Sequence, residues 1–190
     1  MLKGILQYAH TLLEKSVEKG ETVIDATCGN GHDTLFLSKL VGEQGHVIAF
    51  DIQQQAIDNT KQRLEQHNRT NVTLIHANHA HIEKYIHEKE HGSIGGAIFN
   101  LGYLPRSDKA VITKGETTVQ AMKGILKHLK TNGLIVAVIY HGHAGGKEEK
   151  NAILKFTTTL DQKHFKVIQY GFINQKNNPP FIVAIQKLKP

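Results

Sequence analysis

Two β-rich runs near the end of the chain constrain its fold more than any other feature. Residues 165–173 and 181–186 are separated only by the segment NQKNNPP, which is too short for a crossover between parallel strands. The two runs are therefore expected to form an antiparallel hairpin. Earlier β-rich runs alternate with amphipathic stretches, as in a parallel sheet covered by helices. The sequence predicts an α/β, Rossmann-like fold with a seven-stranded, mostly parallel sheet, a C-terminal antiparallel hairpin and helices on both faces.

Hydrophobic periodicity and turn signals place the elements within one domain that spans residues 1–190. Helices are expected over residues 2–18, 32–40, 54–66, 80–87, 117–129 and 148–160. Strands are expected over residues 22–27, 46–52, 72–77, 94–101, 134–140, 165–173 and 181–186. A doubly wound sheet that closes with a hairpin is the class I methyltransferase form of this fold, as distinct from the dinucleotide-binding dehydrogenase form.

Composition narrows the setting in which the chain works. No apolar run approaches the roughly 20 residues that span a bilayer, and the N-terminus lacks the features of a signal peptide, so no membrane partner is expected. The single cysteine, Cys28, fits a reducing compartment and predicts a cytoplasmic protein. A net charge of +6 and a pI near 9.3 suit a polyanion such as RNA. The charges are scattered, however, so charge alone leaves the partner open.

A glycine-containing turn follows the first expected strand and indicates a cofactor site. The strand ends at Asp25, the turn reads ATCGNG, and a helix begins near His32. Glycines let the backbone turn tightly and approach a ligand. Asp51 ends the next strand, where a carboxylate can accept both hydroxyl hydrogens of a ribose. The combination predicts an adenosine cofactor.

The charge at the start of that helix favours S-adenosylmethionine over NAD. Asp33 and Thr34 stand where a dehydrogenase has its third glycine. An acid there repels a pyrophosphate but can pair with the ammonium or sulfonium of S-adenosylmethionine. The plainer alternatives are a strand-end acid at Asp25, a capping acid at Asp33 and a small buried residue at Cys28. The predicted cofactor-binding residues are Cys28, Gly29, Asn30, Gly31, His32, Asp33, Thr34, Asp51, Ile52, Gln53, Asn78, His79 and Asn100.

The end of the third expected strand lies where an adenine ring would sit. Asn78 can hydrogen-bond the exocyclic amine of the ring, and His79 can pack beside it. A metal site formed by His76, His79 and His81 is the competing interpretation. At a strand-to-helix junction these side chains point in different directions, and no cysteine or acid lies close by, so no metal is expected.

The fourth expected strand ends in Asn100-Leu101-Gly102-Tyr103-Leu104-Pro105, beside the cofactor turn. This run is similar to the Asn/Asp-Pro-Pro-Tyr/Phe motif of methyltransferases that act on nitrogen. In that motif the Asn oxygen accepts a hydrogen bond from the amine, and the aromatic ring stacks on the base. Leu101 and Gly102 replace the two prolines, which fits a pendant amine better than a flat ring amine. An ordinary strand end with a Gly-Tyr turn is the alternative.

Two further loops are expected at the same edge, residues 140–146 and 174–180, although their composition also suits ordinary surface loops. His141 or His143 can accept a proton from a substrate amine near neutral pH. The predicted catalytic residues are Asn100, Tyr103 and His141. The predicted substrate-binding residues are Leu101, Gly102, Tyr103, Pro105, Arg106, His143 and Asn178.

The segments DATCGNGHDT, AFDIQ, NLGYLPRSDK, YHGHAGG and NQKNNPP together resemble the YtqB/MnmM family of S-adenosylmethionine-dependent RNA methyltransferases. The resemblance covers essentially the whole chain. It implies methylation of the amine of 5-aminomethyl-2-thiouridine at the wobble position of tRNA, with the anticodon stem-loop as partner and a homodimer as an open question. It also implies that the cofactor residues are Asn30, Asp33, Asp51, Gln53, Asn78 and His79, that Asn100 and Tyr103 hold the amine and base, and that His141 and His143 lie nearby.

Other functions remain open on the residues alone. They are an rRNA or small-molecule amine methyltransferase, and a module that binds S-adenosylmethionine or RNA without catalysis. Direct displacement at the sulfonium carbon needs no covalent intermediate, so Cys28 has no role in the expected chemistry.

Overall fold

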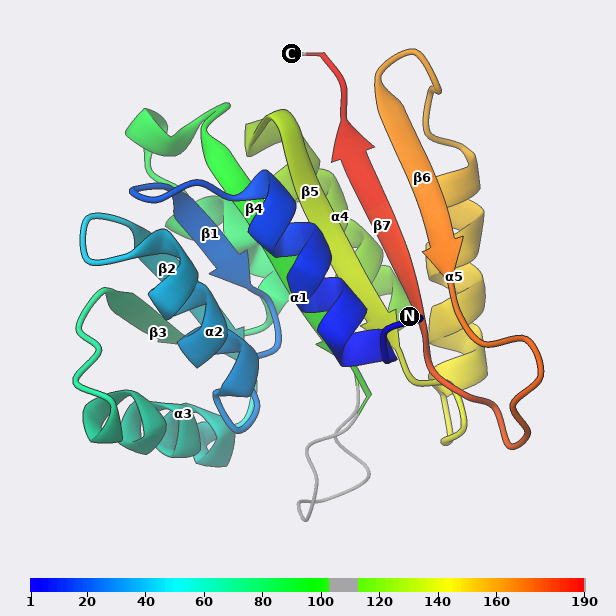
Figure 1. Ribbon diagram of the computed structural model, residues 1–190, viewed down its shortest axis with the longest axis horizontal. Coiled ribbons are helices and arrows are strands. Elements are labelled where there is room, and N and C mark those ends of the chain that lie inside the picture. The colour runs from blue at the N-terminus through cyan, green and yellow to red at the C-terminus, as the bar shows by residue number, and fades with distance from the viewer. Residues whose placement is uncertain (103–112, 190) are drawn as a thin grey trace.

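The computed structural model describes residues 1–102 and 113–189 and contains a seven-stranded sheet (Figure 1). The strands follow the order β3-β2-β1-β4-β5-β7-β6. All neighbours pair in parallel except β7, which is antiparallel to both β5 and β6. The predicted α/β fold with a C-terminal hairpin is thereby confirmed. The strands are β1 (Thr22–Asp25), β2 (His46–Asp51), β3 (Val72–His76), β4 (Ile94–Leu101), β5 (Leu129–Ile139), β6 (Phe165–Tyr170) and β7 (Phe181–Lys187).

Helices cover both faces of the sheet. One face carries the first three helices and the other carries the 3₁₀ helix η1 with the last two helices (Figure 1). The helices are α1 (Ile5–Ser16), α2 (His32–Val41), α3 (Gln54–Gln66), η1 (His79–Tyr85), η2 (Glu88–Glu90), α4 (Gly115–His128) and α5 (Gly146–Thr158). In the parts of the chain that the structure describes, no helix is both long and apolar enough to cross a membrane.

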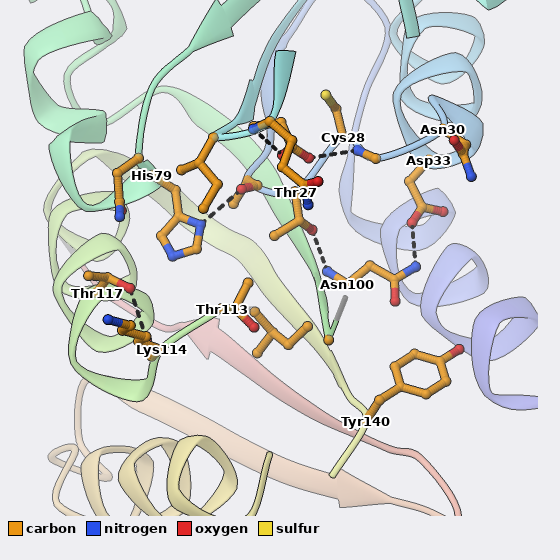
Figure 2. Close-up of a pocket in the computed structure, with 18 of the residues that line it drawn as sticks. Thr27, Cys28, Asn30, Asp33, His79, Asn100, Thr113, Lys114, Thr117 and Tyr140 are labelled. Carbon is orange, nitrogen blue, oxygen red and sulfur yellow. Dashed lines mark hydrogen bonds between the residues drawn. The ribbon is translucent and has the colours of Figure 1, made fainter. Parts of the chain in front are cut away.

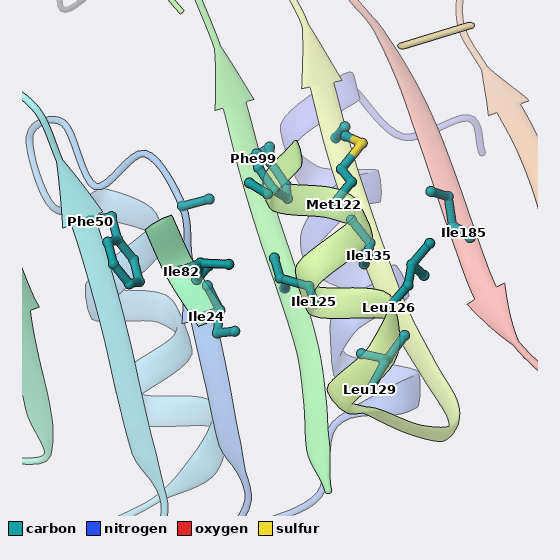
Figure 3. Close-up of a cluster of buried hydrophobic side chains, with 14 of the residues drawn as sticks. Ile24, Phe50, Ile82, Phe99, Met122, Ile125, Leu126, Leu129, Ile135 and Ile185 are labelled. Atoms are coloured by element: carbon teal, nitrogen blue, oxygen red, sulfur yellow. The ribbon is translucent and has the colours of Figure 1, made fainter. Parts of the chain in front are cut away.

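The core lies in two layers because successive side chains of a strand point to opposite faces. In β4, Ile98 faces α1 and α2, whereas Phe99 faces η1 and α4. The layer beneath α4 contains Phe99, Met122, Ile125 and Ile135, all fully buried (Figure 3). Such strands, buried on both faces, read as the continuous apolar runs from which the parallel sheet was predicted.

Several ends differ from the sequence prediction by two or three residues, and η2 was not predicted, but two elements differ in a way that has a clear physical reason. The helix predicted over residues 80–87 is the 3₁₀ helix η1, a short connector in which the Ala80 N–H donates to Asn78 Oδ1 at 2.8 Å. The strand predicted to begin at residue 134 begins at Leu129, which pairs with Ile94. The ladder is irregular just after this pair, and Asn132 adopts a positive φ of 65°. The polar residues before the apolar run hid this part of the strand.

The strand order reverses at the β1–β4 pair. To one side of this pair the chain continues to β2 and β3, and to the other side it continues to β5. The loops that leave β1 and β4 therefore diverge and open a crevice at the carboxyl ends of the strands, where open α/β sheets bind their ligands. The glycine turn and Asn100 meet at this crevice.

Candidate active site

A cavity of about 670 Å³ occupies the crevice at the carboxyl ends of the strands. Its volume falls within the range of small-molecule sites. Five strands contribute to its wall through the residues that follow or end them, and α1 and the start of α4 close it from the two sides (Figure 2). The residues in the wall are Leu6, Ala26, Thr27, Cys28, Gly29, Asn30, His32, Asp33, Asp51, Ile52, Gln53, Ala77, Asn78, His79, Asn100, Leu101, Gly102, Thr113, Lys114, Thr117 and Tyr140.

Asp51 ties the glycine turn to the end of β2. Its Oδ2 accepts a hydrogen bond from the Gly29 N–H at 3.0 Å, and its Oδ1 accepts one from the Gln53 N–H at 3.0 Å. Burial raises the pKa of the carboxyl, while these backbone N–H groups lower it. The residue also forms part of the cavity wall. The carboxylate thus lies where the sequence predicts a partner for the ribose hydroxyls.

Gly31 is required by packing rather than by ligand approach. Its φ is +77°, and an added Cβ would lie 2.9 Å from the Cα of Thr60 in α3. Neighbouring Asn30 is also held by α3, since its Oδ1 accepts from Asn59 Nδ2 at 2.8 Å and its carbonyl accepts from Arg63 Nε at 2.6 Å. Helix α3 thus holds the turn on the side away from the cavity. Asn30 and His32 line the cavity wall.

Asp25 and Thr34 form a buried pair behind the turn. Both residues are completely buried, and the Thr34 hydroxyl donates to Asp25 Oδ2 at 2.6 Å. The other oxygen of Asp25 accepts from the Thr27 N–H at 3.1 Å. Burial first, and the charge of Asp33 second, raise the pKa of Asp25 to about 7. Thr34 was predicted to bind the cofactor, but it lies outside the cavity wall and supports the turn instead.

The carboxylate of Asp33 joins α1 to the end of β4. Its Oδ1 lies 2.7 Å from His10 Nε2, and its Oδ2 accepts from Asn100 Nδ2 at 3.1 Å. The Asn100 N–H donates to Thr27 Oγ1 at 2.7 Å (Figure 2). Asp33 was predicted to pair with a cationic ligand. The structure gives it two protein partners, while part of the residue still faces the cavity.

The residues after β3 lie where the adenine was expected. His79 is buried, and burial lowers its pKa, so the ring is neutral near pH 7. Its Nδ1 lies 3.0 Å from the Ala26 carbonyl, which can only accept, so Nδ1 carries the proton. Nε2 of His76 instead faces the Ile52 carbonyl at 2.9 Å. Within residues 1–102 and 113–189, no group of three or more His, Cys, Asp or Glu side chains is arranged to hold a metal ion.

Cys28 lies in the cavity wall with an inert thiol. The residue is buried, and burial followed by the charge of Asp25 raises the pKa of the thiol. Only the thiolate is a good nucleophile, so the site offers no activated cysteine at neutral pH.

The start of α4 forms the wall opposite the glycine turn. Thr113, Lys114 and Thr117 line the cavity there. The Thr113 hydroxyl donates to Glu149 Oε2 at 2.6 Å, and Thr118 donates to Glu149 Oε1 at 2.7 Å. Burial raises the pKa of Glu149. Lys114 is exposed and places a positive charge at the mouth of the cavity.

The structure brings together most of the residues predicted from the sequence. Of the predicted cofactor residues in the described part of the chain, Gly31 and Thr34 alone lie outside the cavity wall. Leu101 and Gly102 line the wall, whereas the predicted residues His141, His143 and Asn178 do not. His141 packs edge-to-face on Phe181, with ring centroids 5.6 Å apart. Tyr103, Pro105 and Arg106 lie outside the described residues.

Sequence reasoning missed the contributions of α1 and of the start of α4, and it did not single out Tyr140 within the loop expected over residues 140–146. Leu6 and His10 come from the first helix, which precedes every motif in the chain. Tyr140 directly follows β5, and its position at a strand end was the available signal. For Leu6 and His10 no local pattern exists, because their place depends on how α1 packs across β4 and β5.

The donor set of the cavity fits S-adenosylmethionine. Asp51 offers acceptors for a ribose, and the polar side chains at Asn78 and His79 flank an adenine position. The Asp33 carboxylate and the Asn100 amide lie in the same wall and offer polar groups to the charged methionine part. A pyrophosphate bound at the start of α2 would instead meet the carboxylate of Asp33, which disfavours NAD.

Comparison with known proteins agrees with this geometry. The family model described as "Putative rRNA methylase" matches residues 47–186. A tRNA (mnm(5)s(2)U34)-methyltransferase of Arabidopsis thaliana chloroplasts is 35% identical, with 97% of this chain and 70% of the relative covered.

Solved structures give the same result. The Streptococcus mutans protein SMU.1697c, solved in complex with SAH, superposes with a TM-score of 0.90 at 45% identity, over 99% of this chain and all of that one. An rRNA methylase of Streptococcus thermophilus superposes with a TM-score of 0.83 at 36% identity, over 100% of this chain and 99% of that one. The chain therefore belongs to the rRNA methylase family of that description and is an S-adenosylmethionine-dependent methyltransferase.

Proposed function

We propose that the protein methylates the amine of 5-aminomethyl-2-thiouridine at the wobble position of tRNA, giving 5-methylaminomethyl-2-thiouridine. An RNA substrate is supported by the family description and by the names of the relatives. The wobble uridine is supported by the Arabidopsis relative, whose match extends over 97% of this chain. A net charge of +6 is compatible with a polyanionic substrate.

One observation supports an amine as the methyl acceptor, namely the orientation of the Asn100 side chain. A carboxylate offers only hydrogen-bond acceptors, so the end of the Asn100 amide that faces Asp33 must be the Nδ2 donor. The carboxamide oxygen then points away from Asp33, toward the side of the cavity where Tyr140 lies (Figure 2). An oxygen held in this way accepts a hydrogen bond from an amine N–H and directs the nitrogen lone pair.

The role of the chain is to position two reactants. S-adenosylmethionine supplies an electrophilic methyl group on its sulfonium when it is bound. The amine must be neutral to attack, because an ammonium has no lone pair. Asn100 Oδ1 orients that amine, and a pendant aminomethyl group can reach it past Gly102, which has no side chain in the way. Holding reactants in line accounts for much of the rate enhancement in such transfers.

Tyr140 is the aromatic surface that the described cavity offers to a base. The residue is half-buried, and burial raises the pKa of its hydroxyl, so the ring stays neutral. Leu6 adds an apolar contact on the α1 side, and Lys114 adds a positive charge at the mouth. An aromatic ring stacked on an extruded base is the usual way in which proteins hold an unpaired nucleotide.

The test uses tRNA from a strain in which the gene is deleted. Purified protein and S-adenosylmethionine are added, the tRNA is digested, and its nucleosides are measured by mass spectrometry. The expected result is loss of the aminomethyl nucleoside and a matching gain of the methylaminomethyl nucleoside. Methyl incorporation into rRNA or small amines while tRNA stays inert would contradict the proposed target. Cofactor binding without any turnover would contradict enzymatic activity on RNA altogether.

A pair of asparagine variants links the activity to the site. Asn100→Ala removes the oxygen that accepts the hydrogen bond of the amine. It is expected to lower kcat about 100-fold, in the range of a lost orienting contact. Asn151→Ala changes an exposed position on α5 and serves as the matched control. Equal rates for the two variants would contradict the role given to Asn100.

A further inference from the structure

His10 lies on α1, outside every motif, and yet it reaches the active site. Its flanking residue Ala9 and the later Leu13 are fully buried, which fixes this face of α1 against the sheet. The imidazole stacks on Phe36 with ring centroids 3.9 Å apart and planes 5° from parallel. Nε2 then lies 2.7 Å from Asp33 Oδ1. The ring is held in place by its stacking and its hydrogen bond together.

Asp33 connects His10 to Asn100 through hydrogen bonds to both. The side chain of Asp33 is only 9% exposed, so water gives it little help in balancing its charge. Its two oxygens are divided between His10 on one side and Asn100 Nδ2, at 3.1 Å, on the other. The contact with His10 restricts the orientations in which the carboxylate can accept from Asn100. Loss of the His10 contact would free the carboxylate to rotate and would leave a buried charge with one protein partner fewer.

We infer that His10 is a positioning residue for methyl transfer, which orients the Asn100 carboxamide through Asp33. The inference rests on the proposed function in one respect, that Asn100 Oδ1 accepts the hydrogen bond of the substrate amine. The chain His10–Asp33–Asn100 runs from α1 across the helix start at α2 to the end of β4. It therefore couples the first helix of the protein to the reacting nitrogen. His10 itself does not line the cavity.

Two substitutions separate the hydrogen bond from the shape of the ring. His10→Phe keeps an aromatic ring to stack on Phe36 but cannot donate to Asp33. His10→Gln loses the ring but keeps an N–H donor. His164→Phe is the matched control, because His164 also faces an aspartate, Asp161, at 3.6 Å, but at an exposed site on the chain segment before β6.

The variants are compared by kcat and KM on undermodified tRNA and by the affinity for SAH in calorimetry. His10→Phe is expected to lower kcat about 10- to 100-fold, the range for a lost orienting contact, while the Kd for SAH changes less than about threefold. His10→Gln should recover most of the rate, and His164→Phe should match the wild type. A His10→Phe enzyme with wild-type kcat would overturn the inference, as would equal losses in kcat and SAH affinity. If His10→Phe does not fold, His10→Ala takes its place with the same expected results.

A measurement on the free enzyme keeps this inference separate from the choice of substrate. The side-chain amide of Asn100 gives a pair of ¹⁵N–¹H resonances, which Asn100→Ala identifies by their loss. These resonances should shift in His10→Phe and stay close to their wild-type positions in His10→Gln and His164→Phe. Unchanged resonances in His10→Phe would overturn the inference even with an active enzyme. A wild type that is inactive on tRNA would instead overturn the proposed function and leave this readout intact.

Discussion

Replacing Asp25 by asparagine is expected to change the pH dependence of stability. Asp25 is completely buried at the end of β1, and its pKa is raised from 3.8 to about 7 by burial and by the charge of Asp33. An asparagine has the same shape. Its Oδ1 can accept from the Thr27 N–H as before, and its Nδ2 can donate to the Thr34 hydroxyl, which reverses the direction of the second hydrogen bond.

The size of the effect follows from the shift in pKa. Between about pH 4 and pH 7 the folded protein keeps a proton on Asp25 that the unfolded chain has released, so the free energy of unfolding falls as pH rises. The shift is roughly three units at 1.36 kcal/mol each, which amounts to about 4 kcal/mol by pH 8, with about 3 kcal/mol of it between pH 5 and pH 8. Asp25→Asn carries no such titration. Its stability relative to wild type should therefore rise across this window and level off above pH 7.

Urea unfolding followed by far-ultraviolet circular dichroism measures this difference, since the chain contains no tryptophan. Curves at several pH values from 5 to 8.5 are recorded for wild type, for Asp25→Asn and for Asp58→Asn. Asp58 is exposed on α3, where its carboxylate accepts from Gln54 at 2.9 Å, and its replacement should leave the pH profile unchanged. A constant difference between Asp25→Asn and wild type over this range would refute the reasoning.

Three further substitutions test the turn and its surroundings. Asp51→Asn should weaken SAH binding about 10- to 100-fold in calorimetry, because it removes the charge that would accept the ribose hydroxyls; an unchanged Kd would place the ribose elsewhere. Gly31→Ala should lower the free energy of unfolding by about 1–3 kcal/mol more than Gly20→Ala, since both have positive φ but only Gly31 would bring a Cβ against Thr60. Equal losses in urea unfolding would argue against that contact. Cys28→Ala should keep at least about half of the wild-type kcat, given its inert thiol, and a tenfold loss in the same assay would give the thiol a role.

The topology could be predicted because its signals are local. Apolar runs of strand length, the helices between them and the short NQKNNPP segment each show in a few consecutive residues. The start of β5 escaped prediction because Lys130, Thr131 and Asn132 are polar, and they join the strand only through pairing near Ile94. Such pairing is decided by tertiary contacts rather than by propensity.

The candidate site divides in the same way. The turn and Asp51 could be predicted because the strand, the glycines and the acid lie close together in the sequence. Asn100 and Gly102 could be predicted because they lie at the end of β4. The contributions of Leu6 and His10 could not, because α1 reaches the cavity by packing across β4 and β5, far from it in sequence. Thr34 was assigned to the ligand by its neighbours in the motif, although its hydroxyl turns inward to Asp25.

The place of β7 between β5 and β6 has a consequence for synthesis on the ribosome. Because β7 follows both β5 and β6 in the sequence, this edge of β5 stays unpaired until β7 has been synthesised. An open edge with apolar faces is prone to pair with other chains. When residues 181–187 emerge they close both gaps at once, pairing with β5 on one side and β6 on the other. A nascent chain stalled before this strand would therefore be the form most in need of a chaperone.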